Sequence, residues 1–469
     1  MLSILSIIAV IFLLGFCIFI HELGHLLVAL WRKLHVEKFS IGFGKKLWGT
    51  HYKGVEYVIS MLPFGGYVAL PQLDPSDQPV DSKDGKPLPH AKPLDRILTA
   101  FAGPLSNIIL GFILAAVLWR VGEYKPVAVD HYVVHSVEED SAEAKAGLKP
   151  RDVIWTLNGE AVPKYWEAVL ERIVLMTTDV TLGLERDGDR FEVTYPLEPN
   201  GNPRFGDLPV PRFEVREPVI IEKLSPGMPA EEAGLKPGYF LLSVNGKPVA
   251  NKDDFIRKLR DVDGAAVTIE YQDGQHESRF VTLEPREQLV DGEPLMENGK
   301  VLKLIGVTPG RVMELVNVNP WARFIEILNQ NKRTLKAVVS PQSKVGAKDM
   351  SGPVGILRIL YVVTRYGDYR KLLWFLILIN FGLAILNLMP IPVLDGGHIL
   401  LAVVELVIRR RIPHQVANVL QTVCAVALIG FIIYVSGYDV NRLFRSFFPK
   451  KAPEVTESVT EPPLDPPSE

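Results

Sequence analysis

Residues 21–25 read His-Glu-Leu-Gly-His, a spacing that can build a hydrolytic metal site. On a helix, positions i and i+4 share a face, so the imidazoles of His21 and His25 can both reach one zinc ion. Glu22 then lies beside the water that the metal activates and can act as a general base. The motif follows a long apolar run, where an ionisable side chain costs at least about 2.5 to 3.5 kcal/mol and usually marks function. The pattern therefore favours catalysis over a cluster of satisfied polar side chains.

A third protein ligand must come from elsewhere, because a catalytic zinc typically has three protein ligands and one open position. The two cysteines, Cys17 and Cys424, lie within apolar runs, which excludes a disulfide framework and a cysteine-based zinc finger. Two carboxylates, Asp395 and Glu405, lie inside the other apolar runs. They are the candidates for the third ligand.

Depth in the membrane separates these two candidates. At about 1.5 Å per helical residue, His21 lies about 29 Å from the start of its apolar run and Asp395 about 35 Å from the start of its own. By the same count Glu405 lies about 50 Å in. Asp395 therefore matches the histidine pair, and Glu405 is expected at the cytoplasmic interface.

The sequence around Asp395, Asn-Leu-Met-Pro-Ile-Pro-Val-Leu-Asp-Gly-Gly at 387–397, should interrupt a helix. Pro390 and Pro392 remove backbone donors, and the paired glycines loosen the chain. Irregular backbone at membrane depth is tolerated only where protein or a water-filled cavity surrounds it, and such a cavity would supply water for hydrolysis. Asn387 could donate a hydrogen bond to a substrate carbonyl or a developing oxyanion, or it could hold two helices together.

Four apolar stretches are long enough to cross a bilayer, whose hydrocarbon core needs roughly 20 helical residues. They cover residues 2–20, 97–119, 372–389 and 416–435, and the third continues as far as Ile408. The first lacks a small-residue cleavage site and is expected to be retained rather than removed as a signal peptide. Ten Lys and Arg in residues 32–96, and three Arg at 409–411, predict that these loops face the cytoplasm. The N-terminus, the long central segment and the C-terminus then lie outside.

Length and charge restrict the class of protein further. The 469 residues suffice for about three folding units. They carry 51 Lys and Arg against 54 Asp and Glu, a net charge of -3 with no basic block, which offers no electrostatic footprint for nucleic acid. With 48% hydrophobic residues, many gathered in runs near both ends, the chain is not wholly soluble.

The segment between the second and third apolar stretches contains a tandem repeat. Residues 142–150 end in Gly-Leu-Lys-Pro and precede Asn158-Gly159, and the same order returns before Asn245-Gly246. Each copy predicts a short helix, a turn, an apolar strand, an Asn-Gly hairpin turn and a further helix. This order resembles the circularly permuted PDZ domains of bacterial proteases. Because a PDZ fold adds an extended peptide to a sheet edge, the pair is expected to dock peptides or exclude large proteins, with a spacer as the alternative.

Residues 36–70 alternate polar and apolar positions among several glycines, which predicts hairpins rather than a helix. An exposed edge there could pair with an unwound substrate, so Gly42, Phe43 and Gly44 are candidate substrate contacts, with a structural cap as the alternative. His398 is expected to support the ligands from behind or to be a mere neighbour, with the latter favoured, because the zinc site is complete without it. Asn107 could support the site, but packing against another helix is the favoured use.

Three motifs and the paired repeats together resemble the bacterial site-2 proteases over nearly the whole chain. The motifs are those at 21–25 and 387–397, and Phe-Ala-Gly-Pro-Leu-Ser-Asn at 101–107. The resemblance implies that His21, His25 and Asp395 bind Zn2+ and that Glu22 is the catalytic base. It implies cleavage of single-span membrane proteins, such as an anti-sigma factor already cut outside the membrane, and of remnant signal peptides. It also implies a bacterial cytoplasmic (inner) membrane protein with its active site near the cytoplasmic side.

We therefore expect a zinc-dependent intramembrane endopeptidase. Its expected fold is a multi-pass α-helical membrane protein with four transmembrane helices, a membrane-associated β segment and two extracytoplasmic PDZ-like α+β domains. Two other classes stay open, a proton- or ion-coupled transporter and a catalytically inactive PDZ-bearing adaptor. The expected division is 1–31 for the first helix, 32–96 for the β segment and a Pro-rich loop, 97–120 for the second helix, 127–211 and 212–300 for the PDZ-like domains, 301–371 for an amphipathic linker, 372–408 for the third helix, 416–436 for the fourth and 449–469 for a disordered tail.

Overall fold

The structure is a computed structural model that describes residues 2–73, 80–82, 85, 87–200, 208–262, 264–287, 289–290, 293–294, 296–297, 300–301 and 303–447. The expected Pro-rich loop lies partly, and the expected tail at 449–469 wholly, outside these residues. The chain divides into two compact units. The first comprises Met1–Leu197, Pro211–Glu214 and Val312–Val440, and the second comprises Glu198–Val210, Val215–Arg311 and Asn441–Glu469.

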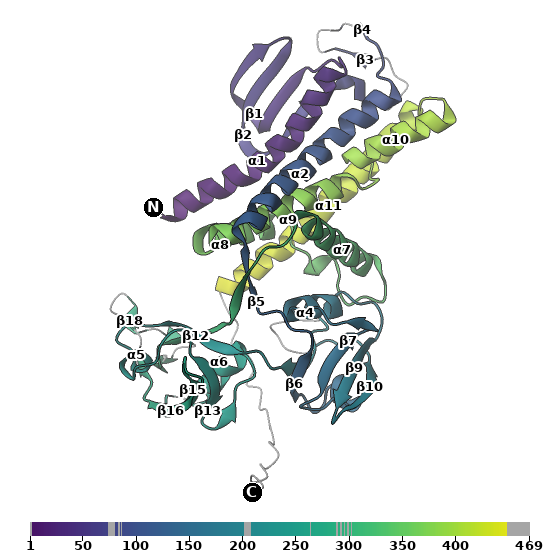
Figure 1. Cartoon of the computed structure of the whole chain (residues 1–469). Helices are drawn as coiled ribbons and strands as arrows, with labels where there is room; N and C mark the ends of the chain where they lie inside the picture. Colours follow the sequence, from purple (N-terminus) through teal and green to yellow (C-terminus); the bar gives the residue numbers. More distant parts are fainter. Residues whose placement is uncertain are drawn as a thin grey trace. The chain divides into compact units, whose positions relative to one another are not determined.

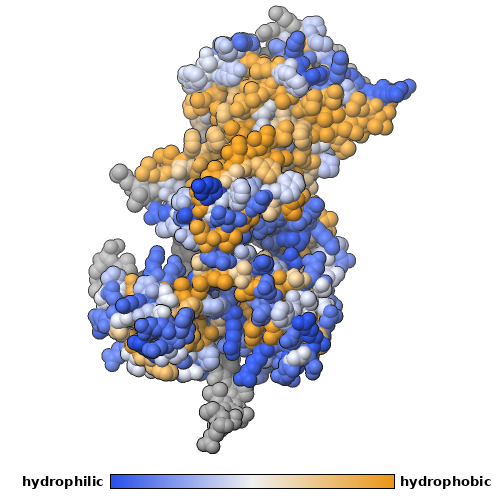
Figure 2. Space-filling view, in the orientation of Figure 1, coloured by the Kyte–Doolittle hydropathy of each residue, from blue (hydrophilic) through white to orange (hydrophobic). Residues whose placement is uncertain are grey.

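Within the described residues, four helices of the first unit are long and apolar enough to cross a membrane, and they cover the predicted apolar stretches. Helix α1 runs on past Ile20, so the motif at 21–25 lies inside it. Helix α2 packs against α1, α9 and α10 and so contacts most of the bundle (Figure 1). Hydrophobic residues gather on the surface of these helices (Figure 2). The bounds of these four helices are α1 (Leu2–Trp31), α2 (Pro93–Val121), α9 (Tyr369–Asn387) and α11 (His414–Phe447), and the shorter α10 (Asp395–Ile408) follows α9.

The third apolar stretch is two helices, because residues 388–394 between α9 and α10 form turns. The interruption predicted from Pro390 and Pro392 is therefore present. The paired glycines have a more specific use than loosening the chain. A Cβ on Gly396 would lie 2.4 Å from the Leu388 carbonyl oxygen, and one on Gly397 would lie 2.1 Å from that of Ile391. Only glycine lets the first turn of α10 pack this closely on the connecting backbone.

The segment after α1 forms an antiparallel pair, β1 (Lys38–Tyr52) and β2 (Val55–Ala69), as its alternation predicts. Residues 38–41 of β1 pair with 56–59 of β2 on one side and with 66–69 on the other. The sheet packs on the end of α1 through a cluster that includes Leu26, Ala29, Phe39 and Val55. This packing brings the 66–69 segment close to the motif in α1.

The first repeat folds as a six-stranded sheet of order β10-β9-β7-β6-β11, with β8 paired to β7. Its Asn158-Gly159 turn has φ values of 50° and 78°, as a tight hairpin of this type requires. The elements are β6 (Tyr132–Val137), α3 (Ala142–Lys145), β7 (Val153–Leu157), β8 (Glu160–Ala161), α4 (Trp166–Val174), β9 (Val180–Arg186), β10 (Asp189–Tyr195) and β11 (Phe213–Val215).

The second repeat has the same topology, with the order β16-β15-β13-β12-β23 and β14 paired to β13. Its core includes Ile221, Phe255 and Ile269, all fully buried. The elements are β12 (Val219–Leu224), α5 (Pro229–Glu232), β13 (Phe240–Val244), β14 (Lys247–Pro248), α6 (Lys252–Asp261), β15 (Val267–Gln272), β16 (Ser278–Leu283) and β23 (Val307–Arg311).

The boundaries expected at residues 211 and 300 are wrong, because each cuts off the last strand of its sheet. Strands β11 and β23 lie beyond them and pair with β6 and β12, which are distant in sequence. Strand β11 has only three residues and β23 contains Pro309 and Gly310, so neither forms the longer alternating run that predicts a strand.

The remaining residues of the expected amphipathic linker at 301–371 also form strands and helices. They include β24 (Met313–Val316), which pairs with β5 (Glu123–Pro126), followed by helices α7 (Pro320–Val339) and α8 (Pro353–Tyr366). Short elements complete the described chain: η1 (Pro71–Leu73), β3 (Val80–Asp81), β4 (Pro87–Leu88), β17 (Arg286–Glu287), β18 (Leu289–Val290), β19 (Glu293–Pro294), β20 (Met296–Glu297), β21 (Lys300–Val301), β22 (Lys303–Leu304) and η2 (Ala347–Asp349).

Candidate metal centre

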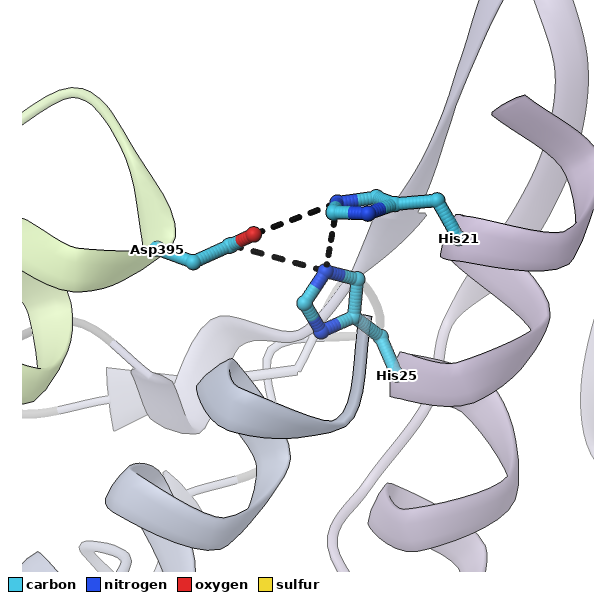
Figure 3. A group of neighbouring side chains, drawn as sticks. All are labelled: His21, His25 and Asp395. Atoms are coloured by element: carbon cyan, nitrogen blue, oxygen red, sulfur yellow. Dashed lines mark hydrogen bonds and ion pairs between the residues drawn. The ribbon is translucent and has the colours of Figure 1, made fainter. Parts of the chain in front are cut away.

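Three potential ligands meet where α1 and the start of α10 face each other. His21 Nε2 lies 3.1 Å from Asp395 Oδ2, and His25 Nε2 lies 3.4 Å from Asp395 Oδ1. The two Nε2 atoms are 3.2 Å apart. Figure 3 shows both imidazoles of α1 pointing toward the carboxylate. In the part of the chain that the structure describes, this is the one group of three or more His, Cys, Asp and Glu side chains close enough to share a metal ion.

The position of Asp395 follows from the break in the third apolar stretch. The turns at 388–394 end α9 and begin a new helix, of which Asp395 is the first residue. A carboxylate is favoured at a helix N-terminus, because it interacts well with the unpaired amides and the helix dipole. The break therefore places a stable anionic ligand opposite the histidine pair.

The donor set fits a zinc ion. His25 Nδ1 donates to the backbone carbonyl of Thr99 at 2.7 Å, since that oxygen can only accept. In the neutral imidazole the proton is thus on Nδ1, and the lone pair of Nε2 points toward Asp395. Two neutral imidazoles and a carboxylate whose ligand atoms converge within 4.8 Å can share a metal ion. Two His and one carboxylate are also a common ligand set of catalytic zinc.

Helix α2 makes room for the histidines, and the sequence prediction did not foresee this use. A Cβ on Gly103 would lie 2.2 Å from His25 Nε2 and 2.9 Å from His21 Cε1. A Cβ on Gly24 would lie 2.4 Å from the Ala102 carbonyl oxygen, so glycine also allows α1 and α2 to approach closely. The available signal was the spacing of Thr99, Gly103 and Asn107, which at intervals of four share one face of α2.

Glu22 faces the β segment beside the three ligands. Its side chain hydrogen-bonds to the backbone of Val68 and interacts electrostatically with His21, His25 and Asp395. A Cβ on Gly66 would lie 3.1 Å from Glu22 Cγ. The carboxylate is therefore next to the ligands and next to the 66–69 segment of β2, where a base could meet both water and substrate.

The other expected contact residues lie on β1 and at the end of α9. Gly42 and Gly44 have φ values of 87° and 88°, a conformation that favours glycine. The Phe43 ring between them is 45% exposed and stacks on Tyr67, with centroids 6.2 Å apart. Asn387 is the last residue of α9 and is half-buried.

Two further polar residues, Asn107 and His398, lie on helices that supply or surround the ligands. Asn107 is fully buried, and its Nδ2 lies 3.4 Å from His21 Nδ1, so it contacts the centre rather than only packing between helices. His398 lies on α10 outside the group of three ligands.

Glu405 is paired inside the protein, a contact that the sequence did not predict. It is 7% exposed and accepts a hydrogen bond from Arg96 Nη1 at 2.5 Å, and Arg96 is itself 1% exposed. The pair links α10 to α2 inside the first unit. The guanidinium neutralises Glu405 where it is buried, which leaves Asp395 as the carboxylate that faces the histidines.

Comparisons with known proteins show which family this chain resembles. The profile of peptidase family M50 matches residues 9–431. The regulator of sigma-E protease RseP from Salmonella typhimurium (strain 14028s) is 31% identical over 423 residues, which cover 86% of this chain and 92% of the relative. Its namesake from Escherichia coli K12 is 30% identical over 416 residues, covering 84% and 88%. A Vibrio cholerae protein named "Putative zinc metalloprotease" is 28% identical over 438 residues, covering 87% and 92%. The family expected from the motifs is thereby confirmed, and this chain belongs to peptidase family M50.

Proposed function

We propose that this chain is a zinc-dependent intramembrane endopeptidase that cleaves single-span membrane proteins. The observation that carries the proposal is the convergence of His21 and His25, on a helix long enough to span a membrane, with Asp395 at the start of α10. Glu22 lies beside these three residues. The names of the relatives agree, since one names zinc and two name regulation of sigma E.

In this mechanism His21, His25 and Asp395 hold the metal. Bound zinc supplies a Lewis acid that polarises the scissile carbonyl and lowers the pKa of water. Glu22 accepts the proton of the attacking water and returns it to the leaving amide nitrogen, so that both products leave in a stable protonation state. Asn387 donates a hydrogen bond to the carbonyl oxygen as its negative charge develops.

The β segment presents the substrate in extended form, because a helix shields its own amide bonds. A peptide that pairs along residues 65–69 of β2 runs past Glu22, which lies against Gly66 and Val68. Gly42, Phe43 and Gly44 contact the same peptide from β1.

The two repeats act as PDZ-like domains that screen substrates outside the cytoplasm. In the second repeat α6 packs beside β23, the strand that borders the peptide groove in a PDZ fold. In the first repeat Trp166 of α4 packs on Phe213 of β11, with centroids 5.8 Å apart, and fills the corresponding space. The second domain is therefore better suited to dock a peptide, and the first to limit size.

The chain resides in the bacterial cytoplasmic (inner) membrane as a four-span protein. Its N-terminus and both PDZ-like domains face the periplasm, and the metal centre lies near the cytoplasmic side. Its substrates are an anti-sigma factor already cut outside the membrane, within a stress response, and remnant signal peptides.

A cleavage assay with the purified full chain and a single-span test substrate examines the proposal. We expect Glu22→Gln to lower the cleavage rate by about 10²- to 10⁴-fold, as loss of a general base does, while bound zinc is unchanged. Glu185→Gln, in an exposed ion pair of the first repeat, is the matched control and should cleave normally. A chelator should stop cleavage and added zinc should restore it. Undiminished cleavage by Glu22→Gln would remove the proposed mechanism; ion movement without cleavage would instead favour a transporter.

A further inference from the structure

One face of α2 carries the groups that surround the histidine pair from outside. Thr99, Gly103 and Asn107 follow one another at intervals of four, and all three are buried. Thr99 offers its carbonyl oxygen to His25, and Gly103 leaves space for both rings. Asn107 is the one member of this face with a polar side chain directed at His21.

The hydrogen bonding of Asn107 is incomplete. Its Nδ2 lies 3.4 Å from His21 Nδ1, at the long limit of a hydrogen bond. Among the described residues its Oδ1 has no hydrogen-bond partner, although Asn107 is fully buried. Buried carbonyl oxygens are almost always hydrogen-bonded, so this amide is poised for a contact that it does not yet make.

The chemistry of a metal-binding histidine supplies that contact. If His21 Nε2 gives its lone pair to a metal, the proton must reside on Nδ1, which then needs an acceptor. Asn107 Nδ2 is itself a donor, so two N–H groups would face each other. A half-turn about the Cβ–Cγ bond of Asn107 exchanges its two polar atoms and presents Oδ1 to Nδ1–H instead. One rotation therefore gives Oδ1 a donor and Nδ1–H an acceptor, and it moves Nδ2 to the place that Oδ1 held.

We propose that Asn107 is a positioning residue that accepts the Nδ1–H of His21 and so holds Nε2 toward the metal, as the Thr99 carbonyl does for His25. This inference rests on the proposed zinc site and deepens it. Histidines that bind metals almost always donate their other N–H to such a partner, which fixes the tautomer and the orientation of the ring. The two histidines thus share one orienting helix, with a backbone acceptor for one and a side-chain acceptor for the other.

Three substitutions separate an acceptor from a packing group. Asn107→Leu keeps a side chain branched at Cγ but has no acceptor, and Asn107→Ala removes both the branched group and the acceptor. Asn107→Asp keeps the size and offers carboxylate oxygens that accept the same N–H. If Asn107 only packs between helices, Leu should be tolerated and a buried Asp should not; if it orients His21, the order should be reversed.

The test is zinc affinity of the full chain in detergent, measured with zinc ions against a competing chelator. We expect Asn107→Ala and Asn107→Leu to bind zinc about 10- to 100-fold more weakly than the wild type, and Asn107→Asp to stay within a few-fold of it. The matched control is Asn380→Ala, which removes another fully buried asparagine that contacts Cys17 rather than the ligands. It should keep wild-type affinity.

The absorption spectrum of the cobalt-loaded protein gives a second readout that packing alone would not move. It should change in Asn107→Leu and remain close to the wild type in Asn107→Asp. Wild-type zinc affinity in Asn107→Leu, or an equal loss in Asn107→Asp and Asn107→Ala, would overturn the role of Asn107 while leaving the zinc site intact. Failure of the wild type itself to bind zinc would overturn the proposed function instead.

Discussion

Helix α10 carries two carboxylates with different surroundings. Asp395, its first residue, faces the Nε2 atoms of two histidines at 3.1 and 3.4 Å. Glu405, ten positions later in the same helix, faces the guanidinium of Arg96 at 2.5 Å. Both side chains lie among apolar helices, where an unpaired negative charge would be very costly.

The partner decides what each carboxylate can do. Imidazoles have lone pairs and share a carboxylate with a metal ion, so the Asp395 cluster can take a cation and release it. A guanidinium is always charged and has only donors, so Arg96 balances the charge of Glu405 without a metal ion. Asp395 is thereby available for chemistry, while Glu405 joins α10 to α2 and holds the helix that presents Asp395.

The largest difference should appear in metal binding. We expect Asp395→Asn to weaken zinc binding by more than the roughly 100-fold that loss of an outer-shell partner can cost, because it removes a charged ligand itself. Cleavage of a single-span substrate should fall to background. Bound metal after dialysis against a chelator is the measurement.

Glu405→Gln is the control for this first prediction. It replaces a carboxylate of the same helix by its amide. The folded fraction of this variant should bind zinc with wild-type affinity. Equal loss of zinc affinity in the two variants would contradict the assignment of metal binding to Asp395 and of helix pairing to Glu405.

Much of this division was visible in the sequence. The motif at 21–25 identified two ligands, and the fixed rise of a helix predicted that Asp395 lies at their depth. The same count gave a depth for Glu405 but could not give its partner in α2. The turns at 388–394 start a new helix, as the prolines of this stretch predicted.

The sequence did not predict which residues of different helices contact one another. Arg96 precedes the second apolar stretch and looks like an ordinary juxtamembrane arginine, yet it is fully buried against Glu405. Gly103 and Thr99 look like typical residues of a membrane helix, and only the packing of α2 on α1 reveals their use. The closing strands β11 and β23 were missed for the same reason, since pairing with a distant strand leaves no local pattern.

The stability of the fold should depend on Glu405, whereas zinc binding should depend on Asp395. We expect Glu405→Gln to lower the free energy of unfolding by about 3 to 5 kcal/mol, because it leaves the Arg96 charge buried without a counterion. Arg96→Met should cost less, since Glu405 Oε1 also lies 4.0 Å from Arg411 Nε. Denaturant unfolding in mixed micelles measures both.

A double substitution sharpens this second prediction. Arg96→Met combined with Glu405→Leu removes both charges and should regain most of the lost stability, because apolar pairs often replace buried ion pairs without cost. A double variant as unstable as Glu405→Gln would show that the pair stabilises the fold through the packing of its side chains and not through the balance of its charges.

The smallest expected effect concerns the space beside the metal centre. A Cβ on Gly103 would lie 2.2 Å from His25 Nε2, and one on Gly111, two turns along α2, would lie 2.5 Å from the Phe381 ring. Both alanine substitutions overpack the same helix and should cost about 1 to 3 kcal/mol of stability. Only Gly103→Ala displaces a ligand, so we expect it to lower zinc affinity about tenfold or more while Gly111→Ala leaves it unchanged. Unfolding stability and chelator competition, measured on both variants, therefore separate damage to the helix bundle from damage to the metal centre. If Gly111→Ala lost zinc affinity as much as Gly103→Ala, the position of the ligands would depend on the packing of the whole helix and not on the face of α2 that touches them.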